Sequence, residues 1–272
     1  MKEKIQVVNS KGEKEPFSFK KIYLAARNCG APKKLAFEIA SQIKREAFDG
    51  ISTAQIFERI FELLKERAFP SAIKFNLKKA MEKLGPTGFP FEKFVGKIFE
   101  KEGYKVQLNK IVPGFCLKYE IDVIAQKEKT VYIVECKYHQ LPGGRVDLQV
   151  ALANFARFLD IQKGKFLNSG VVYKSLLVTN TKFTFEAINY SRCVNVELLG
   201  WKFPPQKGLE KLIEKNNLFP ITILPSVSAS LGKMLVENGI VLVEDVFLPQ
   251  FEKIELKEKE QILKEAKILL KK

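Results

Sequence analysis

The chain has 272 residues, 46% of them hydrophobic, which allows two or three domains with cores of their own and excludes a disordered tail. No run approaches 18 apolar residues, the N-terminus lacks the apolar stretch of a signal peptide, and the four scattered cysteines form no C-x-x-C pair. We therefore expect a cytoplasmic protein without a membrane span, a disulfide framework or a zinc ribbon. The net charge of +15 favours a polyanionic partner such as nucleic acid, although a Lys- and Glu-rich thermophile surface has a similar composition.

Residues 1–85 are predicted to form a small, mostly helical domain. Ser52, followed by Gln55 three residues later, is a capping box at the start of a helix. Ser71 is expected to cap the last helix, which stops at Gly85. In chain order, the predicted elements are a strand at 4–8, a turn at 9–12, and helices that begin near residues 17, 33, 52 and 71.

The start of this domain carries a recognisable pattern. It consists of Ile5, Val7 and Val8 in the strand, Gly12 in the turn, and Phe17-x-x-x-Lys21-Ile22. The stretch resembles an ATP-cone, the nucleotide-binding regulatory module best known from ribonucleotide reductases. The family's basic turn V-x-K-R-D-G reads V-V-N-S-K-G here, so its first basic positions are missing. The resemblance implies that ATP or dATP binds with its phosphates near Lys11, Lys20 and Lys21. A helical DNA-binding or dimerisation module without nucleotide is the alternative.

A turn-rich linker, G-P-T-G-F-P at residues 85–90, marks the first predicted domain boundary. An amphipathic helix is expected behind it, ending at Gly103. Glu92 flanks the apolar stripe in the first turn of this helix. A favourable interaction with the helix dipole would explain an acidic residue there without any role in a site.

The rest of the chain is organised around residues 119–139, where two β-rich runs flank the polar stretch Q-K-E-K-T and predict a hairpin. If its loop holds two or four residues, Asp122 comes opposite Glu135, with Lys137 two residues further on. Like charges across a strand pair are destabilising, so a divalent cation between them is the natural occupant. Carboxylates of this kind position Mg²⁺ for phosphodiester hydrolysis, and a neighbouring lysine can orient water or stabilise the phosphate. An odd loop would leave a surface hairpin with solvated charges.

The spacing of these residues is also that of a known family. Asp122, twelve intervening residues and then Glu135-Cys136-Lys137 resemble the core of the PD-(D/E)xK nucleases, in their Mrr-like restriction endonuclease branch. Ile121 stands where the usual proline would be. The helix that begins Phe91-Glu92, and the pattern Gly103-Tyr104-x-Val106 behind it, match that branch in order.

The resemblance implies a complete catalytic set. Asp122, Glu135 and Glu92 would bind Mg²⁺. Lys137 would position the attacking water or stabilise the transition state. Gln149 would approach the site from the next helix, although simple solvation also explains a glutamine there.

The elements beyond the hairpin complete the α-β-β-β-α-β order that this nuclease fold requires. The helix after the hairpin is expected to point inward with Val150, Ala153, Phe155, Ala156 and Leu159. The predicted elements are a helix at 146–159, a strand at 175–180, a helix at 183–190 and a strand at 194–199.

The tail from about residue 204 is expected to be helical. Residues 226–247 faintly resemble a helix-turn-helix unit of the SAM-like or helix-hairpin-helix sort, which binds DNA phosphates through backbone amides; a protein-docking module is the alternative.

The sequence therefore predicts a multidomain α/β protein with an ATP-cone-like domain at 1–85, a restriction-endonuclease-like domain at 86–203 and a small helical domain at 204–272. The expected function is Mg²⁺-dependent hydrolysis of DNA, regulated by nucleotide at the N-terminal domain. A DNA-binding or nucleotide-sensing protein with a non-catalytic core is the alternative. One PD-(D/E)xK centre cuts one strand, so concerted cleavage of both strands would need a homodimer.

Overall fold

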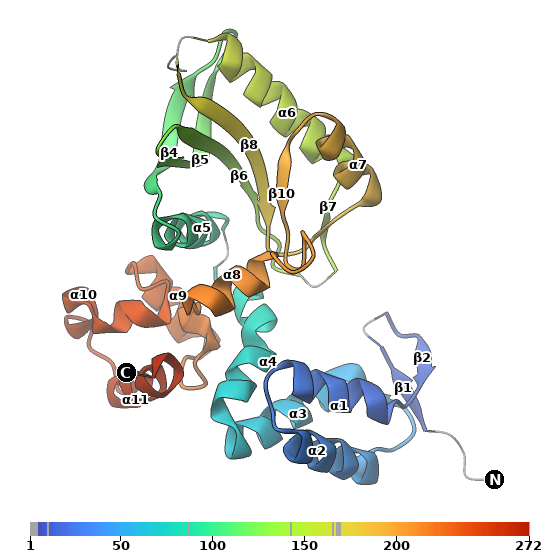
Figure 1. The fold of residues 1–272 in the computed structure, drawn as a ribbon. Coiled ribbons are helices and arrows are strands. Elements are labelled where there is room, and N and C mark those ends of the chain that lie inside the picture. Colours follow the sequence, from blue (N-terminus) through green and yellow to red (C-terminus); the bar gives the residue numbers. More distant parts are fainter. Residues whose placement is uncertain are drawn as a thin grey trace. The chain divides into compact units, whose positions relative to one another are not determined.

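The computed structural model describes residues 5–9, 11–85, 87–141, 143–164, 166 and 170–271. It divides into two compact units, the first formed by residues 1–78 and 267–272 and the second by residues 79–266 (Figure 1). The predicted strand at 4–8, turn at 9–12 and linker at 85–90 each include a residue outside the described ones, and the division into three domains stays a prediction. Within the described residues, no helix is long and apolar enough to cross a membrane.

The first unit combines a small sheet with a helical core. The sheet has the order β2-β1-β3, in which β1 runs antiparallel to β2 and parallel to β3. Apolar residues at helical spacing, such as Ile39, Ile43, Ile60 and Leu64, bury one face of each helix in a common core. Its elements are β1 Gln6–Val8, β2 Lys14–Pro16, α1 Phe19–Asn28, α2 Lys33–Glu46, β3 Ile51–Ser52, α3 Thr53–Arg67 and the larger part of α4 Phe69–Glu82.

Capping residues fix where these helices begin. The predicted capping box is confirmed, because Ser52 Oγ accepts the N–H of Gln55 at 3.1 Å and Gln55 Oε1 accepts the N–H of Ser52 at 2.9 Å. The predicted start of the last helix is wrong. Ser71 lies buried inside α4, which begins two residues earlier because proline, here Pro70, is well tolerated in a first helical turn.

The second unit is built on a five-stranded sheet of order β10-β8-β6-β5-β4. Strands β4, β5 and β6 are antiparallel neighbours, whereas β6, β8 and β10 run parallel. A parallel two-stranded sheet pairs β7 with β9. The elements are α5 Phe89–Lys101, β4 Lys105–Pro113, β5 Lys118–Lys127, β6 Thr130–Lys137, β7 Arg145–Val146, α6 Leu148–Lys163, β8 Val172–Thr179, β9 Lys182–Phe183, α7 Phe185–Cys193 and β10 Glu197–Leu199.

Helices cover both faces of this sheet (Figure 1). Ile133 of β6 packs with Phe158 of α6, while the neighbouring Tyr132 meets the ring of Phe99 of α5 at 5.7 Å. Successive side chains of a strand point to opposite faces, so α5 and α6 lie on opposite sides of β6. The order α5-β4-β5-β6-α6-β8 confirms the predicted αβββαβ core and the α/β fold class.

A helical segment completes the second unit. The predicted pair of helices at 226–247 is only partly found, because α9 is an α-helix and η2 is a short 3-10 helix. Asp245, at the centre of η2, accepts the N–H groups of Val241 and Leu242 and so holds the start of this short helix. The elements are α8 Leu209–Asn216, η1 Ile221–Ile223, α9 Ala229–Glu237, η2 Val243–Phe247, α10 Pro249–Glu252 and the larger part of α11 Lys259–Leu270.

The capping box gives a local test of the first unit. Ser52→Ala removes the hydroxyl that accepts the N–H of Gln55, so the opening free energy of α3 should fall by about 1 kcal/mol, measured by amide hydrogen exchange on the full chain. Thr53→Ala, one residue into the same helix, is the control and should leave exchange nearly unchanged. Equal loss in both variants would refute the role of the cap.

Candidate active site

The β5–β6 hairpin has the register that the sequence predicts. Its loop holds the two residues Glu128 and Lys129, and the former adopts a positive φ of 52°. The ladder runs from Lys127↔Thr130 to Val123↔Val134 and ends there. Asp122 and Glu135, the next residues on each strand, therefore lie side by side where the regular pairing stops.

A hydrogen bond from the backbone to the side chain of Asp122 marks the end of the β5–β6 ladder. Asp122 Oδ2 accepts the backbone N–H of Cys136 at 2.7 Å, and the carboxyl is partly buried. Burial raises the pKa of Asp122 to about 7, together with the negative charge of Glu135 and, more weakly, of Glu92; the Cys136 N–H and Lys137 oppose this rise without cancelling it. Three acidic side chains thus interact electrostatically around this position.

Glu135 is a buried carboxylate held between two cations. Its side chain is 8% exposed, its Oε1 lies 2.7 Å from Lys137 Nζ, and its Oε2 accepts a hydrogen bond from the guanidinium of Arg157. Lys137 comes from the same strand and Arg157 from α6. A buried charge is tolerated when it is paired in this way, so the two cations account for an acidic residue inside the sheet.

Glu92 reaches the site from the first turn of α5. Its Oε2 accepts the side-chain amide of Asn109 at 2.7 Å, and Asn109 itself interrupts β4 with a φ of 49°, a conformation that asparagine adopts more readily than most residues. At position 88 a Cβ atom would lie 3.1 Å from Glu92 Oε1, so Gly88 leaves room for the carboxylate. Burial, with a contribution from these three carboxylates, also raises the pKa of the Cys136 thiol well above its usual value.

The three carboxylates are near enough to influence one another without forming a ready-made metal cage. Across the described residues, no group of three His, Cys, Asp or Glu side chains is close enough to hold an ion. The donors are nevertheless of the right chemistry, because hard oxygen ligands suit Mg²⁺. The raised pKa of Asp122 is the observation that supports a cation there, since a positive charge would offset both the burial and the repulsion from Glu135 that raise the pKa of this carboxyl.

Comparisons with known proteins agree with this geometry. The family model Mrr_cat, described as "Restriction endonuclease", matches residues 86–201. An uncharacterized protein of Archaeoglobus fulgidus is 35% identical over 178 residues, which cover 64% of this chain and 98% of that protein. Residues 86–201 form a restriction endonuclease domain of the Mrr type.

Two solved structures extend the comparison. The crystal structure of a protein of unknown function, AF1548, is 33% identical, covers 68% of this chain and 100% of its own, and has a TM-score of 0.57. A repair endonuclease from Pyrococcus abyssi is 19% identical over 39% of this chain and 41% of its own, and its TM-score of 0.29 is too low to support an argument.

The Mrr-type domain places the remaining predicted residue, Gln149, differently from the carboxylates. It is exposed in the first turn of α6 and makes no hydrogen bond to Asp122 or Glu135 within the described residues. The same helix reaches the site through Arg157, eight residues later, which the sequence reading missed. The signal that could have found Arg157 is a cation in the middle of a mostly apolar helix that follows a strand with a glutamate among apolar residues.

The lysines expected near nucleotide phosphates lie in the first unit. Lys11 follows β1 in the β1–β2 turn, where Asn9 Oδ1 accepts its backbone N–H at 2.9 Å. Lys20 and Lys21 are exposed in the first turn of α1, and Lys21 Nζ lies 2.5 Å from Glu15 Oε2. Their nucleotide-binding role stays a prediction.

The raised pKa of Asp122 predicts a pH-dependent stability. Between about pH 4 and pH 7 the unfolded chain releases the Asp122 proton while the folded chain keeps it, so the free energy of unfolding falls as pH rises through this window. Asp122→Asn abolishes this loss. Without metal, the variant should therefore gain stability relative to wild type between pH 5 and pH 8 in denaturant titrations.

Glu120→Gln, at an exposed position on the same strand, is the matched control. It should have the stability of wild type at pH 5 and at pH 8. A parallel loss of stability in wild type and Asp122→Asn would contradict the raised pKa.

Proposed function

We propose that this Mrr-type protein is a Mg²⁺-dependent DNA endonuclease. The observation that carries the proposal is the electrostatic coupling of Asp122, Glu135 and Glu92 at the end of the hairpin ladder, with Lys137 beside them. Carboxylates and a lysine in this arrangement are what metal-assisted phosphodiester hydrolysis requires. Membership of a restriction endonuclease family supports the same reaction.

The residues that would hold Mg²⁺ are Asp122, Glu135 and Glu92. When bound, the ion supplies a water of lowered pKa and stabilises negative charge on the phosphate. Asp122 and Glu135 differ in what each must give up to bind Mg²⁺. Asp122 must give up a proton with a pKa of about 7, whereas Glu135 must exchange at least one of its two ion pairs.

Lys137 has two possible partners in this scheme. Its Nζ forms an ion pair with Glu135 Oε1, yet its side chain is 42% exposed. Release of Glu135 Oε1 would free the ammonium group to orient the attacking water or to stabilise the charge that develops on the phosphate. Arg157 would keep Glu135 Oε2 in place during that exchange, because its guanidinium comes from a separate element packed on the sheet.

DNA is the substrate that the charge of the chain favours. The excess of Lys and Arg is spread over the sequence, with 18 basic against 10 acidic side chains in residues 1–85 and 16 against 11 in residues 86–200. Such an excess attracts phosphate backbones without regard to base sequence. For concerted cleavage of both strands, a second copy of the chain would supply the second centre.

The resemblance of residues 1–85 to an ATP-cone supports a regulatory role for this part of the chain. ATP or dATP would bind there through Lys11, Lys20 and Lys21 and modulate cleavage.

One observation favours a second candidate, a DNA-binding or nucleotide-sensing protein with a non-catalytic core. Both oxygens of Glu135 are already engaged by Lys137 and Arg157, so the carboxylate is satisfied without a metal. Cleavage assays on the wild-type chain and on variants of the site separate the two candidates.

Supercoiled plasmid with Mg²⁺ is the substrate for this test. Asp122→Asn and Glu135→Gln should each lower the nicking rate at least about 100-fold because they remove metal-binding charge. Lys137→Gln should lower it about 100- to 1,000-fold, as loss of a transition-state donor does in other enzymes. Lys129→Gln, an exposed lysine in the turn of the same hairpin, should cleave like wild type.

If Asp122→Asn nicked the plasmid as fast as wild type, the activity would come from a contaminant. Metal-dependent DNA binding without nicking by wild type would favour the non-catalytic alternative.

The regulatory proposal is tested by nucleotide binding. Lys21→Ala should weaken ATP and dATP binding by about tenfold, in calorimetry on the full chain, because it removes one charged contact to phosphate. Lys65→Ala, an exposed lysine on α3, should bind like wild type. Equal affinity in Lys21→Ala and wild type would remove Lys21 from the proposed site.

A further inference from the structure

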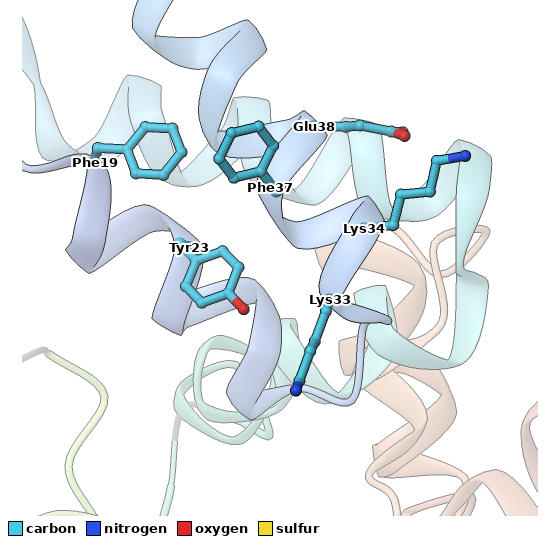
Figure 2. Close-up of a pocket in the computed structure, with 6 residues that line it drawn as sticks. All are labelled: Phe19, Tyr23, Lys33, Lys34, Phe37 and Glu38. Carbon is cyan, nitrogen blue, oxygen red and sulfur yellow. The ribbon is translucent and has the colours of Figure 1, made fainter.

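An aromatic cleft lies between α1 and α2 of the first unit and includes none of the residues assigned to catalysis. Its volume is about 590 Å³, and its walls are mainly apolar. Figure 2 shows the rings of Phe19 and Phe37 facing one another, with Tyr23 one turn further along α1. The lining residues are Phe19, Tyr23, Lys33, Lys34, Phe37 and Glu38.

Phe37 is not needed by the core of the unit. Phe19 and Tyr23 are partly buried against that core, whereas Phe37 is 57% exposed and meets Phe19 edge to face at 5.5 Å. A single edge-to-face contact leaves one face of the Phe37 ring open. An open aromatic face beside basic side chains is suited to stacking on a nucleic acid base.

The cleft continues past Phe37 along the same helix. A second depression of about 410 Å³ shares Phe37 and Glu38 with the first and extends to Arg45 and Arg67. From Lys33 to Arg45 is a distance of about 18 Å along α2, at about 1.5 Å per residue. Phe37 therefore stands between two depressions of one elongated surface, a shape that fits a strand better than a compact ligand.

The charges on this surface favour a polyanion. Glu38 is neutralised by Arg67, and Glu46, one residue beyond Arg45, is paired with Arg59. Within the described part of the chain, Lys33 and Lys34 make no ion pair. Figure 2 shows the ammonium group of Lys33 on the side of Tyr23 and that of Lys34 on the side of Glu38. The acidic side chains are thus paired with arginines while the lysines stay available to phosphates.

We propose that this surface of α2 binds single-stranded nucleic acid, with Phe37 stacking on a base and Lys33, Lys34 and Arg45 contacting phosphates. Stacking on an aromatic ring flanked by cations accepts any base, so the site would hold a strand without reading its sequence. The site shares no residue with the Asp122 centre or with the lysines proposed for ATP phosphates. Its role is to hold a strand, whether or not the second unit cuts it.

Fluorescence anisotropy of a labelled oligo-dT of about 15 nucleotides tests the site on the full chain. The buffer contains EDTA, so cleavage cannot remove the ligand. Phe37→Ala should weaken binding about tenfold or more, because stacking on one base is abolished. Phe48→Ala is the matched control, since Phe48 is 56% exposed, lies in the same unit and is outside both depressions.

The lysines have an independent signature. Lys33→Gln combined with Lys34→Gln should weaken binding and reduce the slope of log affinity against log salt by about 1.4, because the double variant neutralises two fewer phosphates of a single strand. The same oligonucleotide paired with its complement should bind less tightly than the single strand to wild type. The salt slope reports how many phosphate charges are neutralised, and the duplex comparison reports the preference for a single strand. A merely structural role of these residues would change neither.

Three results would overturn the proposal. Phe37→Ala could bind oligo-dT like wild type, or Phe37→Ala and Phe48→Ala could lose equal affinity. Excess ATP could displace the oligonucleotide while Phe37→Ala loses ATP affinity as well, which would make the cleft a nucleotide site. The assay contains EDTA and measures binding alone, so failure of this site and failure of the proposed nuclease activity remain distinguishable.

Discussion

The buried carboxylate of Glu135 is the constraint on which the site depends. A charge in the interior of a sheet needs partners, and here they are Lys137 on the same strand and Arg157 on α6. The ion pair between Glu135 and Arg157 links α6 to the end of the β5–β6 ladder, where Asp122 and Glu135 come together. Loss of either cation would leave one oxygen of this buried carboxylate without its partner, so the structural and the proposed catalytic demands on Glu135 are joined in one set of contacts.

The hairpin and the order of the core could be predicted because their physical rules are local. Side chains alternate along a strand, and a two-residue loop fixes the register, so the neighbourhood of Asp122 and Glu135 follows from residues 119–139 alone. The capping box at Ser52 is equally local. The αβββαβ order needed only the sequence of helical and β-rich runs, and it matches the structure although several boundaries moved by a few residues.

The contribution of α6 could not be predicted because it depends on the rotation of a helix. Apolar residues surround most of α6, so the sequence favoured Val150, Ala153 and Leu159 as its inward face, whereas Ala153 and Leu159 are exposed. The buried residues are Ala151, Asn154, Phe158 and Ile161. Asn154 lies inside because its amide donates to Ser175 Oγ of β8 at 2.9 Å, a partner 21 residues away. That rotation is also what brings Arg157 to Glu135.

The electrostatics of the site explain how a basic protein keeps an acidic centre usable. A phosphate that approaches Glu92, Asp122 and Glu135 meets carboxylates, and the two nearby cations are already engaged by Glu135. A proton on Asp122, whose pKa is raised to about 7 by burial and by the neighbouring carboxylates, lowers this repulsion. In the proposed function, proton and divalent cation then compete for the same carboxylate. Under that proposal, cleavage would be confined to conditions in which the cation prevails, and the basic side chains elsewhere would hold the strand without adding charge to the centre itself.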